Sequence, residues 1–149
     1  MVGDGSQRQS LESLAVQLSV TEQVTFWGQQ LDVAPYFSAA DAFVMSSKSE
    51  GLPISLLQAY SLGLPAVVTD VGGMAEVVRL ANAGITVSPA DPAGMTAAIL
   101  RMASAIGERE QFSKNALVAF ESQFSLEKMV DAYMDLYRST PRAKRIAKH

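Results

Sequence analysis

The chain has 149 residues, close to the ~150 of a single domain, and its 48% hydrophobic and 18% charged residues are typical of a folded globular protein. The sequence contains no cysteine, which excludes a disulfide framework, a thiolate metal site and a cysteine nucleophile. The single histidine, His149, is the last residue, so a Ser-His-Asp triad and a multi-histidine metal site are excluded as well.

Charge is distributed unevenly along the chain. All 15 acidic residues lie within residues 1–137, whereas five of the 12 basic residues lie within 138–149. We therefore predict one domain over residues 1–137 and a basic tail over 138–149. The acidic body argues against nucleic acid as a partner. The tail is expected either to be solvated or to touch anionic membrane lipid.

The sequence also bears on location. No apolar run reaches the ~18 residues of a membrane span, and residues 1–10 hold no apolar segment suited to secretion. We therefore expect a cytoplasmic protein, with peripheral contact at the inner membrane face if the basic tail binds lipid.

Helical and strand patterns alternate along the chain. A helix is predicted over residues 7–18, because Leu11, Leu14, Ala15 and Leu18 follow helical spacing. Short apolar segments predict strands at Val24–Gly28, Ala42–Met45, Ala66–Val71 and Gly84–Ser88. Proline, glycine or capping residues predict helices that begin near positions 32, 53, 72 and 91, and two more over about 108–121 and 126–138.

Alternation of this kind predicts the fold class. Short, almost wholly apolar strands between helices indicate a mainly parallel sheet covered on both faces, in a doubly wound α/β fold. Met1-Val2 followed by Gly3-Asp4-Gly5 resembles the end of a strand and its turn. We therefore expect this sheet to lack its first strand and most of its second.

The segment between the second and third helices is the most informative for function. Ligands of open α/β sheets bind where the strands end. Here a strand ends in small polar residues, Glu50 and Gly51 follow, and a helix begins at once. The N–H groups near Leu52 and Ile54, at the positive end of that helix, suit a diphosphate, and Glu50 suits sugar hydroxyls. Ser47 lies in the same loop and is predicted to bind the donor as well.

The sequence from Ser49 to Val78, SEGLPISLLQAYSLGLPAVVTDVGGMAEVV, resembles the donor-site region of the group 1 glycosyltransferases. These are retaining enzymes of family four with the GT-B fold. Their pattern is E-G-[FL]-[GP]-x4-E-A, then a G-x-P-V-V strand and a G-G-x-x-E-V-V turn. The likeness covers nearly all of residues 2–137 and implies the C-terminal, nucleotide-sugar-binding domain, with a Rossmann-like fold.

The resemblance also assigns roles to individual residues. It places Glu50 beside the donor sugar as the catalytic residue, Gly51 and Leu52 near the sugar and diphosphate, and Gly28 and Gln29 near the nucleotide. The family's second glutamate binds the ribose hydroxyls, and its position here holds Gln58. An amide has one acceptor oxygen, whereas a carboxylate can accept from both hydroxyls, so ribose binding is expected to be weaker.

Other family features are absent from the sequence. The family neutralises the departing diphosphate with a Gly-Arg and a Lys-Gly, needs no metal cofactor, and binds the acceptor glycan or lipid through an N-terminal domain that supplies a histidine. We therefore expect this chain to be truncated and inactive alone, and either to associate with an acceptor domain or to self-associate.

Two other functions remain open. The chain can be a non-enzymatic module, either a relic or a subunit that completes its site with a separately encoded acceptor domain. It can also belong to a GT-B sugar-nucleotide epimerase, although the spacing from Glu50 to Gln58 favours a transferase. The donor sugar, nucleotide base and acceptor are not specified by the sequence.

Overall fold

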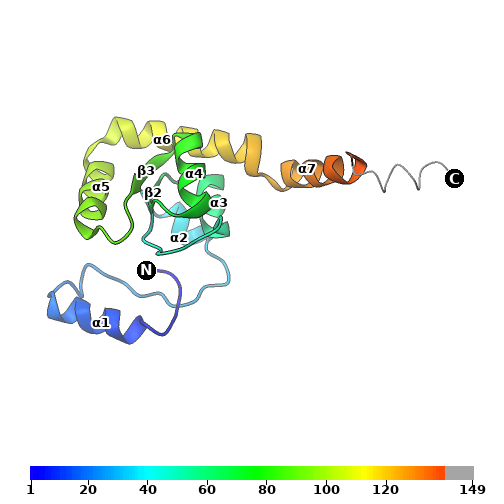
Figure 1. The fold of residues 1–149 in the computed structure, drawn as a ribbon. Coiled ribbons are helices and arrows are strands. Elements are labelled where there is room, and N and C mark those ends of the chain that lie inside the picture. The colour runs from blue at the N-terminus through cyan, green and yellow to red at the C-terminus, as the bar shows by residue number, and fades with distance from the viewer. Residues whose placement is uncertain (140–149) are drawn as a thin grey trace. The chain divides into compact units, whose positions relative to one another are not determined.

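The computed structural model describes residues 1–139, which form two compact units, Met1–Ala39 and a second that begins at Ala40. Each unit is described by itself (Figure 1). The domain boundary expected at residue 138 stays a prediction, and most of the predicted basic tail lies outside the described residues.

The first unit contains α1 (Arg8–Gln17) and α2 (Ala34–Ser38). The prediction of a strand over Val24–Gly28 is wrong, because this segment forms only one parallel bridge, between Val2 and Gly28. Two backbone hydrogen bonds flank this bridge, from Trp27 N to Met1 O at 2.9 Å and from Gly3 N to Gly28 O at 2.7 Å. A strand needs a partner along its length, and residues 1–3 give this segment only a short one.

On α1, Ala15 is buried whereas the other predicted inner residues are not.

The second unit is built on a parallel sheet of three strands: β1 (Phe43–Met45), β2 (Ala66–Thr69) and β3 (Gly84–Val87). The order is β1-β2-β3, and Val67 on the central strand pairs with Val44 on one side and Ile85 on the other. The three predicted strands of this region are therefore confirmed, with β2 ending two residues earlier than expected.

Helices cover both faces of this sheet (Figure 1). On one face, α3 (Ile54–Ser61) and α4 (Gly72–Ala81) pack on Ala66 and Val68. On the other, α5 (Pro92–Ser104) packs on Val67. The next helix, α6 (Ile106–Ala119), contributes to both clusters. The doubly wound α/β class is confirmed, and its cause is the alternation of side chains along β2, which is buried at all four positions.

Local chemistry sets where these helices begin. Asp91 caps α5 by accepting a hydrogen bond from Gly94 N at 2.8 Å, and Pro92 occupies the first turn, as predicted.

The strand β3 begins with Gly84, where a Cβ would lie 1.9 Å from the carbonyl oxygen of Ala66. Only glycine lets β3 approach β2 this closely.

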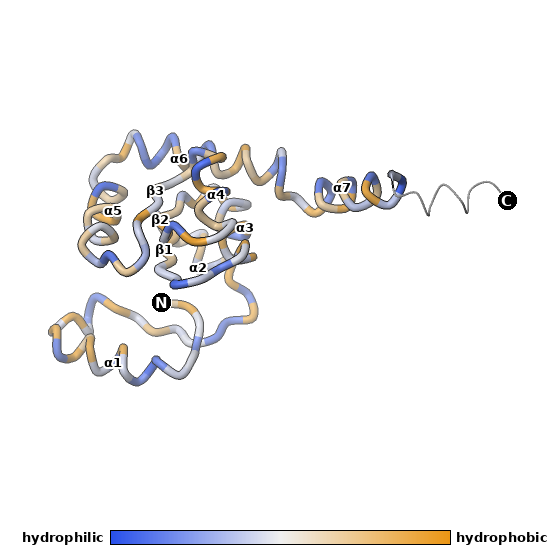
Figure 2. The backbone as a smooth tube through the Cα atoms, viewed as in Figure 1, coloured by the Kyte–Doolittle hydropathy of each residue, from blue (hydrophilic) through white to orange (hydrophobic). Residues whose placement is uncertain are grey.

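The chain then continues through a short π-helix, η1 (Phe120–Phe124), into α7 (Leu126–Ser139). Apolar and polar residues alternate around α7, as Figure 2 shows. The helix forms as predicted and carries the predicted apolar stripe. Within the described part of the chain, however, no residue of α7 is buried. The stripe consists of Leu126, Met129, Val130, Tyr133 and Leu136. Within residues 1–139, no helix is long and apolar enough to cross a membrane.

The packing of α5 on the sheet gives a stability prediction. Met102 is 3% exposed and touches the cluster around Val67, whereas Leu100, on the same helix, is 62% exposed. We expect Met102→Ala to lower the free energy of unfolding by about 2–5 kcal/mol, and Leu100→Ala to change it by no more than about 0.5 kcal/mol. Denaturant unfolding measures both values, and equal small effects would contradict the packing of α5 on this face.

The exposed surfaces give a second prediction. Among the described residues, no strand pairs with the edge of β1 that faces away from β2, and Val44 on that strand is 46% exposed. Open strand edges and apolar helix faces favour association. We expect the purified chain to self-associate or to be marginally stable in sedimentation and thermal melting. A strictly monomeric chain with a cooperative, high melting midpoint would contradict this expectation.

Candidate functional site

The candidate site in the second unit is the loop that joins β1 to α3, at the carboxyl end of the sheet. The strand β1 ends at Met45 and α3 begins at Ile54, so residues 46–53 form the loop. The neighbouring strand β2 ends at Thr69, and α4 starts at Gly72. Because the strands are parallel, the loop and the start of α4 emerge at the same edge of the sheet.

The loop holds the Glu50 carboxylate in place. The hydroxyl of Ser47 donates a hydrogen bond to Glu50 Oε1 at 2.8 Å, and both residues are half-buried. A carboxylate accepts several hydrogen bonds, so this contact fixes one oxygen and leaves further acceptor capacity on Glu50. Ser47, predicted as a donor-binding residue, therefore also orients the predicted catalytic residue.

The backbone of the loop is packed against the segment that follows β2. The hydroxyl of Thr69 donates to Ser47 O at 2.6 Å, and the amide of Met74 donates to Gly51 O at 3.0 Å. A Cβ on Gly72 would lie 1.8 Å from Glu50 O, and one on Gly73 would lie 3.2 Å from Gly51 O. The loop and the start of α4 thus meet through backbone atoms, with no room for side chains between them.

The start of α3 faces this loop without a capping side chain. Its N-cap position is Pro53, whose side chain cannot accept a hydrogen bond, and the next residues are Ile54 and Ser55. The first N–H groups of a helix have no partner within the helix and carry partial positive charge. An anion is therefore favoured at this helix start. Lys48 is exposed in the same loop and adds a cation nearby.

The remaining predicted residues of this unit are accessible. Leu52 is 41% exposed and Ile54 is 73% exposed, and Gln58 is exposed one turn further along α3. Residues four apart lie on the same face of a helix, so Ile54 and Gln58 form one exposed face of α3. The buried side of the helix is formed by Leu56 and Tyr60.

The other two predicted donor-binding residues lie in the first unit. Gly28 is buried with φ +68°, and a Cβ there would lie 3.0 Å from the Nη1 atom of Arg8. Gln29 is exposed. The structure therefore brings six of the predicted residues together in the second unit and places Gly28 and Gln29 in the first. The six are Ser47, Glu50, Gly51, Leu52, Ile54 and Gln58.

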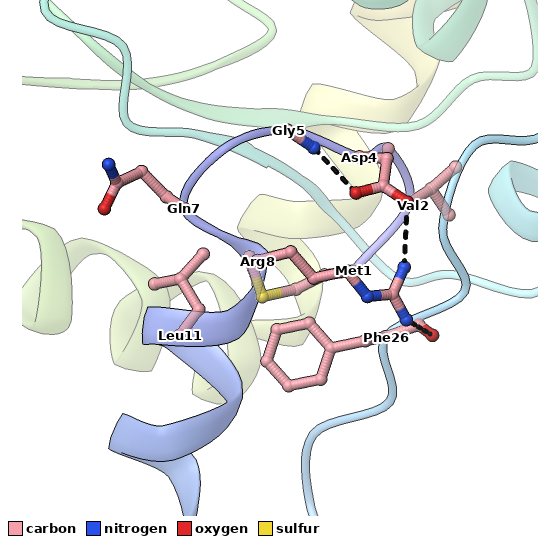
Figure 3. A pocket seen from close by; sticks show the side chains of 9 residues that line it. Met1, Val2, Asp4, Gly5, Gln7, Arg8, Leu11 and Phe26 are labelled. Carbon is pink, nitrogen blue, oxygen red and sulfur yellow. Dashed lines mark hydrogen bonds and ion pairs between the residues drawn. The ribbon is translucent and has the colours of Figure 1, made fainter.

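The first unit also contains a pocket of about 300 Å³ beside Arg8 (Figure 3). The Arg8 guanidinium donates to Glu12 at 2.8 Å and to the carbonyl of Phe26 at 3.2 Å, and it contacts Asp4 at 3.2 Å. The hydrogen bond to Glu12, with added attraction from Asp4, raises the pKa of Arg8 above its usual value. Because this cation is already paired with two carboxylates, it stabilises the turn and is poorly suited to hold another anion.

Sequence reasoning missed the role of Thr69. It singled out Gly72 and Gly73 as the start of a helix, but not their contact with the Glu50 loop. A Gly-Gly pair directly after a buried strand was the available signal, because the ends of parallel neighbours meet at one edge of the sheet. Nothing in the local pattern around Thr69 distinguishes its hydroxyl from that of any other buried threonine.

The model of the family described as glycosyl transferases, group 1, matches residues 1–105 of this chain. The chain belongs to this family. The resemblance noted in the donor-site motif is thereby confirmed.

Among the curated relatives, the lipopolysaccharide core biosynthesis glycosyltransferase LpsE of Rhizobium meliloti is 34% identical over 141 residues. The match covers 95% of this chain and 42% of LpsE. This chain therefore spans about two fifths of the length of that relative.

Solved structures agree on the fold. WaaG, a glycosyltransferase involved in lipopolysaccharide biosynthesis, is 28% identical with a TM-score of 0.74, over 83% of this chain and 33% of WaaG. Anabaena Alr3699/HepE in complex with UDP has a TM-score of 0.86 at 19% identity, over 93% of this chain and 40% of HepE. At that identity the likeness shows the fold alone. The fold of this chain is therefore that of a single α/β domain of GT-B glycosyltransferases.

Proposed function

We propose that this chain binds a nucleotide diphosphate sugar for a glycosyltransferase that moves a hexosyl unit, with retention of configuration, to a glycan or lipid-linked acceptor. The observation that carries the proposal is the loop from Ser47 to Pro53. It combines a hydrogen-bonded carboxylate, Glu50, with an uncapped helix start.

The start of α3 is the proposed site of the diphosphate. The N–H groups of Ile54 and Ser55 and the positive end of the helix favour an anion there, and the backbone of Gly51 lets a ligand approach closely. Lys48 is the one basic residue within positions 46–58 of the sequence. We propose that protein groups rather than a metal ion neutralise the diphosphate, as the family resemblance implies.

Glu50 is the proposed contact for the sugar. With Oε1 held by Ser47, the carboxylate retains acceptor capacity for sugar hydroxyls and can stabilise positive charge that develops on the sugar as its bond to the diphosphate breaks. Gln58 on α3 is proposed to bind the ribose of the nucleotide, and the assignment of Gly28 and Gln29 to the nucleotide, which the family resemblance implies, stays a prediction. The acceptor is proposed to be a growing glycan or a lipid-linked sugar, a choice that the role of LpsE in lipopolysaccharide core biosynthesis supports.

Titration by NMR tests the proposed binding site. UDP is the first probe, because the structural neighbour HepE was crystallised with it, and GDP and ADP test the base. We expect binding in roughly the millimolar range, equivalent to ~4 kcal/mol, with the amide resonances of residues 46–58 shifting most. The affinity should be the same in EDTA. Shifts spread away from residues 46–58 would contradict the assignment.

Gln58 stands where the family has a glutamate, and this difference allows a matched pair of variants. Gln58→Glu restores the family's carboxylate, and we expect it to strengthen nucleoside diphosphate binding several-fold, since a carboxylate accepts from both ribose hydroxyls. Gln111→Glu makes the same chemical change at an exposed position on α6 and should leave the affinity as it was. Equal affinities for all three proteins would show that ribose is not held at Gln58.

The purified 149-residue chain is expected to transfer no sugar above background. Residues 46–58 include one cation, Lys48, for a diphosphate leaving group, where the family resemblance implies several, and these 149 residues span about two fifths of the length of LpsE. Incubation with radiolabelled UDP-glucose and a lipopolysaccharide core acceptor measures this, with a full-length group 1 glycosyltransferase as the positive control. Multiple turnovers by the chain alone would refute the expectation.

A further inference from the structure

We propose that Thr69 and Gly72 are positioning residues for Glu50: together they fix the loop that presents its carboxylate to the sugar. The inference rests on the proposed role of Glu50 in donor binding. It extends the site from the loop between β1 and α3 to the segment between β2 and α4, for which the sequence predicted no role in placing Glu50.

Gly72 sets how closely α4 can approach the loop. Its φ of +53° lies in the left-handed region that side chains rarely adopt, and a Cβ would stand 1.8 Å from the backbone oxygen of Glu50. A flexible side chain could move aside, but a backbone carbonyl moves only with its loop. Any residue larger than glycine at this position therefore forces the Glu50 backbone and the start of α4 apart.

The contact continues into the next two residues of α4. The amide of Met74 donates to Gly51 O at 3.0 Å, so one of the first N–H groups of α4 is satisfied by the loop instead of a capping side chain. A Cβ on Gly73 would lie 3.2 Å from Gly51 O, so this position is also crowded. The start of α4 and the loop thus depend on each other for both packing and hydrogen bonding.

Thr69 fixes the other end of the loop. It is 4% exposed, and its hydroxyl donates to Ser47 O at 2.6 Å. Ser47 in turn donates from its own hydroxyl to Glu50 Oε1 at 2.8 Å. A chain of two hydrogen bonds therefore runs from the end of the central strand to the carboxylate. Thr69 holds the Ser47 backbone, and Ser47 holds the side chain of Glu50.

This arrangement predicts a selective effect on the sugar. The diphosphate is proposed to bind N–H groups of α3, whose position is set by Leu56 and Tyr60 in the core. Glu50 is placed by the loop and its two anchors. Loosening either anchor should therefore weaken recognition of the hexose more than recognition of the nucleoside diphosphate.

Two pairs of variants separate positioning from general destabilisation. Gly72→Ala is matched by Gly63→Ala, because Gly63 also has a left-handed φ, +68°, but a Cβ there would lie 3.4 Å from Ser113 Oγ and within 4 Å of no atom of the loop. Thr69→Val removes the hydroxyl at nearly constant volume, and Thr69→Ser keeps it. If Gly72→Ala fails to fold, the Thr69 pair still tests the inference.

The first measurement is the affinity of the full 149-residue chain for UDP-glucose relative to UDP. We expect Thr69→Val, Gly72→Ala and Glu50→Ala each to lower this ratio by about three- to tenfold, with UDP affinity unchanged within about twofold. Thr69→Ser and Gly63→Ala should keep the wild-type ratio. Adding Gly72→Ala to Glu50→Ala should cause no further loss, because both changes remove the same interaction. Unchanged ratios in Thr69→Val and Gly72→Ala would overturn the proposal.

The second measurement needs no ligand, so it tests the anchoring of the loop separately from the proposed donor binding. We expect the amide resonances of residues 47–52 to shift, and their hydrogen exchange to accelerate, in Thr69→Val and Gly72→Ala but not in Thr69→Ser or Gly63→Ala. If the wild-type chain binds neither UDP nor UDP-glucose, the proposed function fails, while this exchange pattern still supports the anchoring of the loop. An unperturbed loop in Thr69→Val would overturn the anchoring whatever the chain binds.

Discussion

The burial of β2 on both faces is the constraint on which the second unit depends. Its four residues are shielded from water by α3 and α4 on one side and α5 on the other. Both neighbours of β2 run parallel to it and are joined to it by helical crossovers, which is typical of a strand covered on both faces. All three strands then end at the same edge. The loop that carries Glu50 and the segment that carries Gly72 are neighbours for this reason.

Close contact between backbones at this edge ties the loop of the candidate site to the start of α4. The Glu50–Gly51 backbone meets the start of α4 without intervening side chains, and hydrogen bonds from Thr69 and Met74 fix both ends of the contact. Functional loops are commonly mobile unless a rigid scaffold holds them. Here the scaffold is the central strand itself, so the stability of the core and the geometry of the site are coupled.

The chain keeps the fold and motif order of its family, but it has glutamine at position 58 where the family has glutamate. Membership rests on the order and spacing of motifs along the chain, and the fold agrees with it. Gln58 replaces the family's glutamate without disturbing α3, because it is exposed on the face opposite to the buried Leu56 and Tyr60. The helix, its uncapped start and the Glu50 loop are therefore kept together while the proposed ribose contact is altered.

The sequence by itself determined the elements whose signal is local. Apolar strands predicted β1, β2 and β3, Asp91 and Pro92 predicted the start of α5, and the Glu-Gly motif located the loop of the candidate site. These predictions succeed because periodicity and capping depend on residues within a few positions of one another. The strand expected at Val24–Gly28 did not form, since a strand depends on a partner elsewhere in the chain.

Only the tertiary structure decided how the loop is held. The hydrogen bond from Thr69 joins residues 22 positions apart, and the clash that a Cβ on Gly72 would make is with Glu50, which is just as distant in sequence. Such contacts are set by the distance between packed segments, to within a few tenths of an ångström. Composition and periodicity carry no information at that scale, because many sequences with the same pattern place their loops differently.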